Sequence, residues 1–272
     1  MSEFKLIEGI NPPCSNQQYH DDREYLSSSA LKMIVKDPKQ FHDTYILNIE
    51  PENQNKTAFA LGSYLHCMVL EPHLLDVEFA VYTGKTRRGK DWEQFALDNE
   101  GKTVITSSQK GMCDNLFKNY ENTILKLGDK EVSVPSFFKK GNAEETMTAT
   151  IRGVKLKVRT DYRRCDDKYQ SIVDLKSTGD IISTRDQAEE VCAKWDYDLS
   201  AALYCDVAAL VTGRKHDWYF TFMSKKNGEV KVYKASEAML QRGRDKYEDG
   251  ITRIKAGRES GIWFENTVEE LR

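Results

Sequence analysis

Two neighbouring apolar segments carry three charged residues whose types and spacing suit metal-dependent hydrolysis. Asp161 lies in VKLKVRTDYRR, and Asp174 and Lys176 lie in SIVDLKST. Both segments are rich in Val, Ile and Thr and are typical of strands, along which residues two apart share a face. Residues 165–170 form a polar connection of hairpin length, so the two strands are expected to pair. Asp161 and Asp174 can then come close on one face, with Lys176 alongside.

Carboxylates placed together in this way have a chemical use. They repel each other and resist desolvation, and a divalent cation between them removes both costs. Mg²⁺ is usually held by one or two carboxylates together with phosphate oxygens and water. A neighbouring lysine can polarise the attacking water and stabilise charge on a phosphate. Asp-x-Lys is short and common, so the alternative is a surface hairpin with an ordinary ion pair. The apolar neighbours Val173 and Leu175 argue against that alternative.

The remaining pattern predicts an α/β domain with a mixed sheet. Residues 1–25 are polar and are expected to be irregular, and residues 1–272 are expected to form a single domain. Apolar spacing and turn signals predict helices at 30–37, 59–71, 91–99, 107–127, 186–211 and 237–257, and further strands at 146–151, 218–224 and 230–236.

Composition excludes several classes of protein. The 272 residues are 39% hydrophobic and carry a net charge of −3, which argues against disorder and against a wholly basic nucleic-acid binder. A protein that gathers positive charge into one groove is still compatible with this total. Six scattered cysteines with no CxxC pair argue against a Cys-ligated zinc or an Fe–S cluster. No signal peptide or membrane span is recognisable, so a cytoplasmic protein is expected.

The segments around Asp161 and Asp174 resemble the core of PD-(D/E)xK nucleases. Within that superfamily the chain is most similar to the RecE-type exonuclease domain, exodeoxyribonuclease VIII, of phages and prophages. The resemblance implies a restriction-endonuclease-like core, with a mixed central β-sheet flanked by helices. Other segments resemble the same group in the same order, namely YLSSSALKMIVKDPKQF, KTAFALGSYLHCMVLEP, GKTRRGKDWEQF, KWDYDLSAALYCDV and GIWFENTVEEL.

The resemblance implies roles for individual residues. Asp161, Asp174 and the backbone oxygen of Leu175 would be metal ligands, and Lys176 would act on the attacking water. His66 would lie on its helix near the metals, where a neutral imidazole can ligate an ion. Without the resemblance, a histidine in YLHCMVL is more often a core residue. The implied cofactor is Mg²⁺ in a two-metal site, with Mn²⁺ able to substitute.

Further residues are candidates for positions beside the site. Glu145, on the strand before Asp161, could approach the metals, but so could the adjacent Glu144, and the sequence leaves this choice open. Tyr204 matches the family tyrosine after the lysine strand. Many relatives carry Gln four residues earlier, where this chain has Ser200, and a serine reaches less far. Core packing is the alternative for the tyrosine.

Four basic residues are candidates for DNA contacts. Arg87, Arg88 and Lys90 lie in a segment that, in the family, borders the DNA passage, where arginine favours phosphate contacts. A solvated turn is the alternative for this charge run. Arg159 lies on the Asp161 strand and could contact DNA or offset the acidic charge there.

The resemblance implies a Mg²⁺-dependent exonuclease that acts on ends of linear double-stranded DNA, 5′ to 3′. The 3′ single strand would serve a RecT-like annealing recombinase. The resemblance also implies a ring-like homo-oligomer that does not associate with a membrane. It would act in the bacterial cytoplasm and be encoded by a phage or prophage. One alternative is a RecB- or Cas4-like nuclease of other polarity or endonuclease action. A second alternative is a catalytically idle DNA-binding or assembly protein. A third, an α/β enzyme that acts on a small phosphate ester, is not supported, because the sequence has no Gly-rich phosphate-binding loop.

Overall fold

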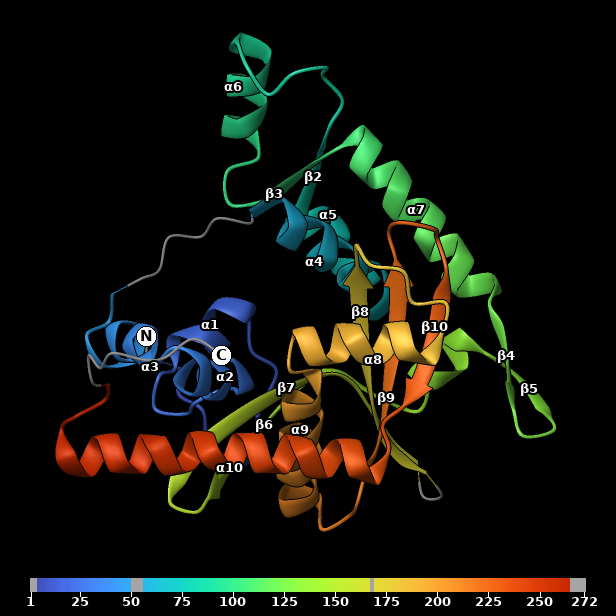
Figure 1. Ribbon diagram of the computed structural model, residues 1–272. Coiled ribbons are helices and arrows are strands. Elements are labelled where there is room, and N and C mark those ends of the chain that lie inside the picture. Colours follow the sequence, from blue (N-terminus) through green and yellow to red (C-terminus); the bar gives the residue numbers. More distant parts are fainter. Residues whose placement is uncertain (1–3, 50–55, 167–168, 265–272) are drawn as a thin grey trace, which may run out of the picture.

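The centre of the fold is a mixed β-sheet (Figure 1). The computed structural model describes residues 4–49, 56–166 and 169–264. Over these residues the sheet has six strands in the order β1-β6-β7-β8-β9-β10, in which β8 and β9 are parallel and the other neighbours are antiparallel. The strands are β1 (Gly9–Ile10), β6 (Gly141–Ile151), β7 (Val154–Cys165), β8 (Gln170–Thr178), β9 (Asp217–Ser224) and β10 (Val230–Lys234).

Helices bury both faces of this sheet. One core joins the apolar residues of β6, β7 and β9 to α2 (Ser28–Lys36), α8 (Arg185–Lys194), α9 (Tyr197–Thr212) and α10 (Glu237–Ser260). A second core joins Leu175, Met223 and Val230 to α4 (Lys56–Leu70) and α7 (Ser107–Asn122). The alternation expected from the sequence is found, since Ile172 of β8 lies in the first core and Leu175 in the second. The predicted α/β class with a mixed sheet is therefore confirmed.

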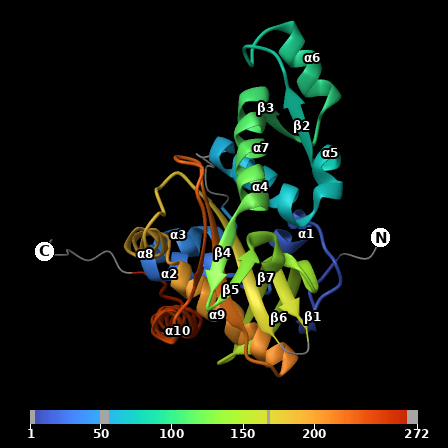
Figure 2. The ribbon, with the colours of Figure 1, turned by 90° about the vertical axis from the view of Figure 1, so that its right-hand side faces the viewer.

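A small arm projects from the body beyond α4 and α7 (Figures 1 and 2). Its strands β2 (Phe79–Tyr82) and β3 (Thr103–Thr106) are parallel, and α6 (Lys90–Asp98) lies between them in the chain. The ring of Tyr82 packs edge-on against that of Trp92, with centroids 5.1 Å apart. The remaining short elements are α3 (Pro38–Phe41), the π-helix at His42–Ile46, the 3-10 turns at Pro72–Leu74 and Val134–Phe138, and α5 (Leu75–Glu78).

Two predicted helices differ from the structure: one ends early and the other is interrupted. The helix predicted at 107–127 ends at Asn122, and β4 (Ile124–Leu127) then pairs with β5 (Lys130–Ser133) through a turn with Gly128 at φ +62°. The helix predicted at 186–211 is two helices, α8 and α9. It breaks at Asp196, whose φ of +46° is a left-handed conformation that Asp tolerates better than most residues.

The sequence predicted an irregular N-terminal segment, but the structure shows two regular elements there. They contain β1, which pairs with β6, and α1 (Asn16–Asp21), which begins with a capping box at Ser15. The Lys157 ammonium donates to the carbonyls of Tyr19 and Asp22, so this segment is fixed along β7. Residues 167–168 of the predicted connection and 265–272 of the C-terminal motif lie outside the described residues. None of the described helices has the length and apolarity needed to cross a bilayer.

Candidate metal centre

Three potential metal ligands from three elements converge at one point. His66 of α4, Glu144 of β6 and Asp161 of β7 each offer a ligand atom, and these atoms all lie within 4.8 Å of one another. His66 Nδ1 and Asp161 Oδ2 are 3.7 Å apart, which is too far for a hydrogen bond. This separation suits two ligands that face a shared ion.

The backbone of β6 turns Glu144 toward this point. The flanking pairs Ala143–Tyr162 and Glu145–Thr160 place Glu144 opposite Asp161. Glu144 has φ +49°, a left-handed conformation that costs a non-glycine residue about 1 kcal/mol or more. Such strain is usually found where the surroundings, or a function, impose it.

Asp161 and Asp174 face each other where β7 and β8 separate. The last pair between these strands is Tyr162–Val173, so the two aspartates occupy the next opposing positions. The N–H of Leu175 donates to Asp161 Oδ2 at 2.7 Å and thereby fixes the Asp161 carboxylate. The strand pairing predicted from the sequence therefore holds at the site. The metal-binding role predicted for the Leu175 carbonyl stays a prediction.

Asp174 and Lys176 form a tight ion pair inside the protein. Asp174 is 6% exposed, and its Oδ1 accepts from Lys176 Nζ at 2.7 Å. Its Oδ2 is buried and has no hydrogen-bond partner among the described residues. A buried carboxylate oxygen without a partner is costly, and a cation would satisfy it.

The electrostatics of the centre favour a cation. Burial raises the pKa of Asp174 to about 6 against the opposing effect of Lys176, and Asp161 adds to the rise. Burial and then the Asp161 charge raise the pKa of Glu144 to about 8. Burial would lower the pKa of Lys176, but Asp174 and Asp161 outweigh it, so this lysine stays protonated. The carboxylate donors fit a hard divalent cation, and the imidazole of His66 is a donor that transition-metal ions also accept.

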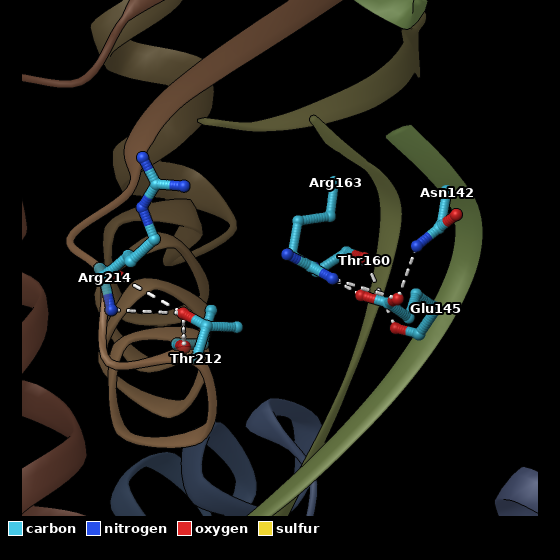
Figure 3. Close-up of polar contacts among 7 residues, drawn as sticks. Asn142, Glu145, Thr160, Arg163, Thr212 and Arg214 are labelled. Atoms are coloured by element: carbon cyan, nitrogen blue, oxygen red, sulfur yellow. Dashed lines mark hydrogen bonds and ion pairs between the residues drawn. The ribbon is translucent and has the colours of Figure 1, made fainter. Parts of the chain in front are cut away.

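Of the two glutamates left open by the sequence, Glu144 reaches the centre. The neighbouring Glu145 points the other way and is held by Arg163, with Nη2–Oε1 at 3.1 Å and a second, closer contact through Nε (Figure 3). Asn142 also donates to Glu145 at 2.7 Å. Glu145 therefore belongs to a structural network on β6 and β7 and is not one of the three potential ligands that converge at the centre.

Arg159 lies at the centre and is not free for DNA in this arrangement. Its Nε is 3.5 Å from Glu144 Oε2, its guanidinium also donates to the Cys14 carbonyl, and its side chain is 12% exposed. The offset of acidic charge that the sequence suggested is found here.

Tyr204 lies on α9 beside the centre, and Ser200 lies one turn earlier on the same helix. Burial raises the pKa of Tyr204 to about 12, and it lies close enough for the charges of Lys176, Asp161 and Asp174 to act on it. Its ring packs edge-on against Trp218 with centroids 5.6 Å apart, so the core-packing alternative is at least partly correct. Ser200 is half-buried, and its backbone N–H bonds the Asp196 carbonyl.

Arg87, Arg88 and Lys90 lie on the arm, at and before the start of α6 (Figure 1). The structure does not bring them to the metal centre. Arg87 donates to the Val104 carbonyl at 2.9 Å and lies over the Trp92 ring at 5.5 Å, so it also supports the arm. All three are exposed, and their contact with DNA stays a prediction.

Comparison with known proteins agrees with this geometry. Residues 27–265 match the family described as a PDDEXK-like domain of unknown function, DUF3799. The chain belongs to this family. The predicted PD-(D/E)xK core is therefore confirmed. The assignment of Asp174-Leu175-Lys176 as its D-x-K and the RecE-type relationship stay predictions. No curated protein matches the chain.

Solved structures also resemble this chain. A "Putative exonuclease" from Eubacterium rectale superposes with a TM-score of 0.65 at 15% identity, covering 93% of this chain and 89% of that one. At this identity the likeness shows the fold. A second structure, of SSO0001, superposes with a TM-score of 0.30 at 12% identity, covering 81% of this chain and 84% of that one.

Proposed function

We propose that this PDDEXK-like nuclease is a Mg²⁺-dependent DNA exonuclease. The observation that carries the proposal is the convergence of His66, Glu144 and Asp161 beside the buried Asp174–Lys176 pair. Each of these groups has a use in phosphodiester hydrolysis, and a bound cation would satisfy the orphaned Asp174 oxygen.

The residues around the centre have distinct tasks. His66, Glu144, Asp161 and Asp174 would hold the metal, and the Leu175 N–H orients the Asp161 carboxylate. A cation bound there polarises a phosphate and lowers the pKa of its water. Lys176 stays protonated, so it can hold the attacking water and stabilise negative charge on the phosphate. Arg159 limits the repulsion between Glu144 and Asp161.

The finer features of the proposal rest on the RecE resemblance. They are action from the 5′ end of linear double-stranded DNA, a 3′ strand passed to a RecT-like annealing recombinase, a homo-oligomer, and a bacterial cytoplasmic setting. Two metals in the site, with Mn²⁺ able to replace Mg²⁺, belong to the same proposal. The name of the Eubacterium rectale neighbour supports exonuclease action over a RecB- or Cas4-like endonuclease or an idle DNA-binding protein.

The test is a product time course on linear duplexes labelled at the 5′ or the 3′ end, with closed circular DNA in parallel. Digestion of linear DNA alone, with Mg²⁺ or Mn²⁺ and not with EDTA, is expected, and the label released first reports the polarity. Asp174→Asn and Lys176→Met should abolish digestion, whereas Asp186→Asn, at a carboxylate whose side chain is 82% exposed, should retain it. Digestion by either site variant would contradict the assigned centre.

A further inference from the structure

Lys32 is a second lysine beside the metal centre, from a different element. It lies on α2, and its Nζ is 5.5 Å from the centre of the Tyr197 ring. Lys176 Nζ of β8 is 5.3 Å from the same ring. The two ammonium groups therefore gather around one tyrosine of α9, next to Asp174.

The orientation of Lys32 follows from the packing of α2. Ser28 lies one turn earlier on the same face, close enough to Tyr204, the other tyrosine of this face of α9, to lower its pKa against the effect of burial. This face of α2 therefore points at the same region of α9 that borders the centre. Helix α2 was predicted from sequence, but its register against the nuclease core was not.

Lys32 lacks the ion pairs that its neighbours have. Its Nζ donates to the Trp195 carbonyl at 2.9 Å, and it forms no ion pair with a carboxylate anywhere in residues 4–49, 56–166 or 169–264. In contrast Lys36, one turn later, pairs with Asp196, and Lys246 pairs with both Asp196 and Asp198 at 2.8 and 2.9 Å.

An ammonium in this position is costly for the protein alone. Burial, and next the charge of Lys176, lower the pKa of Lys32 to about 8. One carbonyl uses one of its three donors, so the others can bind a further acceptor. Lys176 is already bonded to Asp174, whereas Lys32 has its charge available for an anion that enters the site.

We propose that Lys32 binds a phosphate of the DNA strand, next to the phosphodiester that is cleaved. This inference rests on the proposed function and adds a substrate-binding residue to it. A phosphate oxygen would supply the direct ion-pair partner that Lys32 lacks, since the charges of Asp196 and Asp174 act on it without an ion pair. The alternative is structural, since Trp195 ends α8 and a lysine can cap the last carbonyls of a helix.

The experiment compares Lys32→Met, Lys32→Arg and Lys36→Met. Lys36 is the matched control, because it lies on the same helix and also contacts the α8–α9 break. Binding of a fluorescent linear duplex is measured over a range of salt without divalent metal, and KM and kcat are measured with Mg²⁺. Lys32→Met should raise KM and Kd about tenfold, since a charge-assisted hydrogen bond contributes about 1.5 kcal/mol or more. Loss of one phosphate contact should also reduce the slope of log K against log salt by about 0.9.

The controls make each outcome decisive. Lys36→Met should keep the wild-type slope and KM, and Lys32→Arg should recover most of the affinity because it keeps the charge. An unchanged slope in Lys32→Met, or an equal loss in Lys36→Met, would overturn the inference and assign Lys32 to the helix end. If the wild type binds but does not digest DNA, the proposed function fails, while the salt slope still tests Lys32.

Discussion

At the residue scale, the neighbours Glu144 and Glu145 have opposite tasks. Sequence alone could not separate them, because adjacent strand residues point to opposite faces and the register decides which faces inward. The left-handed φ of Glu144 aims it at Asp161, and Arg163 holds Glu145 away. Asp161 and Asp174 were predictable because apolar alternation fixed their strands and the short connection fixed their pairing.

Substitution of the two glutamates should therefore give opposite results. Glu144→Gln should reduce Mg²⁺-dependent digestion by at least about 100-fold, because it removes a ligand. It should also raise the Tm of the metal-free protein at neutral pH, because burial and the Asp161 charge oppose the ionised form of Glu144 in the folded state, and glutamine carries no charge. Glu145→Gln leaves the buried Arg163 without its counter-charge and should cost about 3 kcal/mol of stability, with activity retained below the Tm. Thermal unfolding and digestion assays on both variants check this, and equal activity losses would refute the distinction.

The raised pKa values of Glu144 and Asp174 predict how stability depends on pH. The folded, metal-free protein holds protons on these groups up to about pH 8 and about pH 6, whereas the unfolded chain releases them near the ordinary values of 4.5 and 3.8. Their contribution to stability is therefore complete below about pH 4 and is lost as the pH rises through 6 and then 8. Mg²⁺ competes with these protons, so the rise in Tm caused by Mg²⁺ should grow from pH 5 to pH 8. A rise in Tm that is independent of pH would show that the metal binds elsewhere.

At the element scale, close contact between α9 and α10 keeps Tyr197 and Tyr204 against the centre. Sequence predicted one helix over 186–211, because its apolar spacing continues through Trp195 and Asp196. The break depends on tertiary contacts, since Lys36 of α2 and Lys246 of α10 both pair with Asp196. Periodicity reports the buried face of a helix, but it does not report such distant ion pairs.

Two glycines within helices test this packing with opposite signs. A Cβ added at Gly243 of α10 would lie 2.0 Å from the Asp198 carbonyl oxygen and 2.8 Å from the Ala202 Cβ, so α9 and α10 would have to separate. A Cβ added at Gly111 of α7 meets nothing within 4 Å. Gly243→Ala should therefore destabilise by about 2 kcal/mol as an overpacked contact, whereas Gly111→Ala should stabilise by about 1 kcal/mol through helix propensity. Denaturant unfolding measures both, and a stabilised Gly243→Ala would show that the contact is looser than described.

At the scale of the whole molecule, the net charge of −3 hides how the basic residues are used. The basic residues along β7 and in the turn before it carry charge that could serve DNA, but their side chains are largely paired within the protein. Lys155 pairs with Glu24, Arg152 with Glu248 at 3.1 Å, and Lys157 with two carbonyls of the N-terminal segment. The sequence could not show this, because the partners lie far away in the chain. On the arm, in contrast, Arg88 and Lys90 are exposed, and no ion pair holds either of them within the described chain.

Neutralising Arg88 and Lys90 of the arm should therefore weaken DNA binding, whereas neutralising Lys155 of β7 and Arg152 in the turn before it should not. Each phosphate contact contributes about 0.9 to the slope of log K against log salt, so Arg88→Gln with Lys90→Gln should lower that slope by about 1.8. Arg87 is kept in this variant because it supports Trp92. The matched control is Arg152→Gln with Lys155→Met, which removes two charges that already have partners and should leave the slope unchanged. Because the arm lies apart from the metal centre, kcat at saturating DNA should change little in the arm variant. Equal slopes of log K against log salt for the two double variants would mean that DNA does not contact the arm. A smaller slope in the Arg152→Gln, Lys155→Met variant alone would mean that DNA contacts the sheet instead.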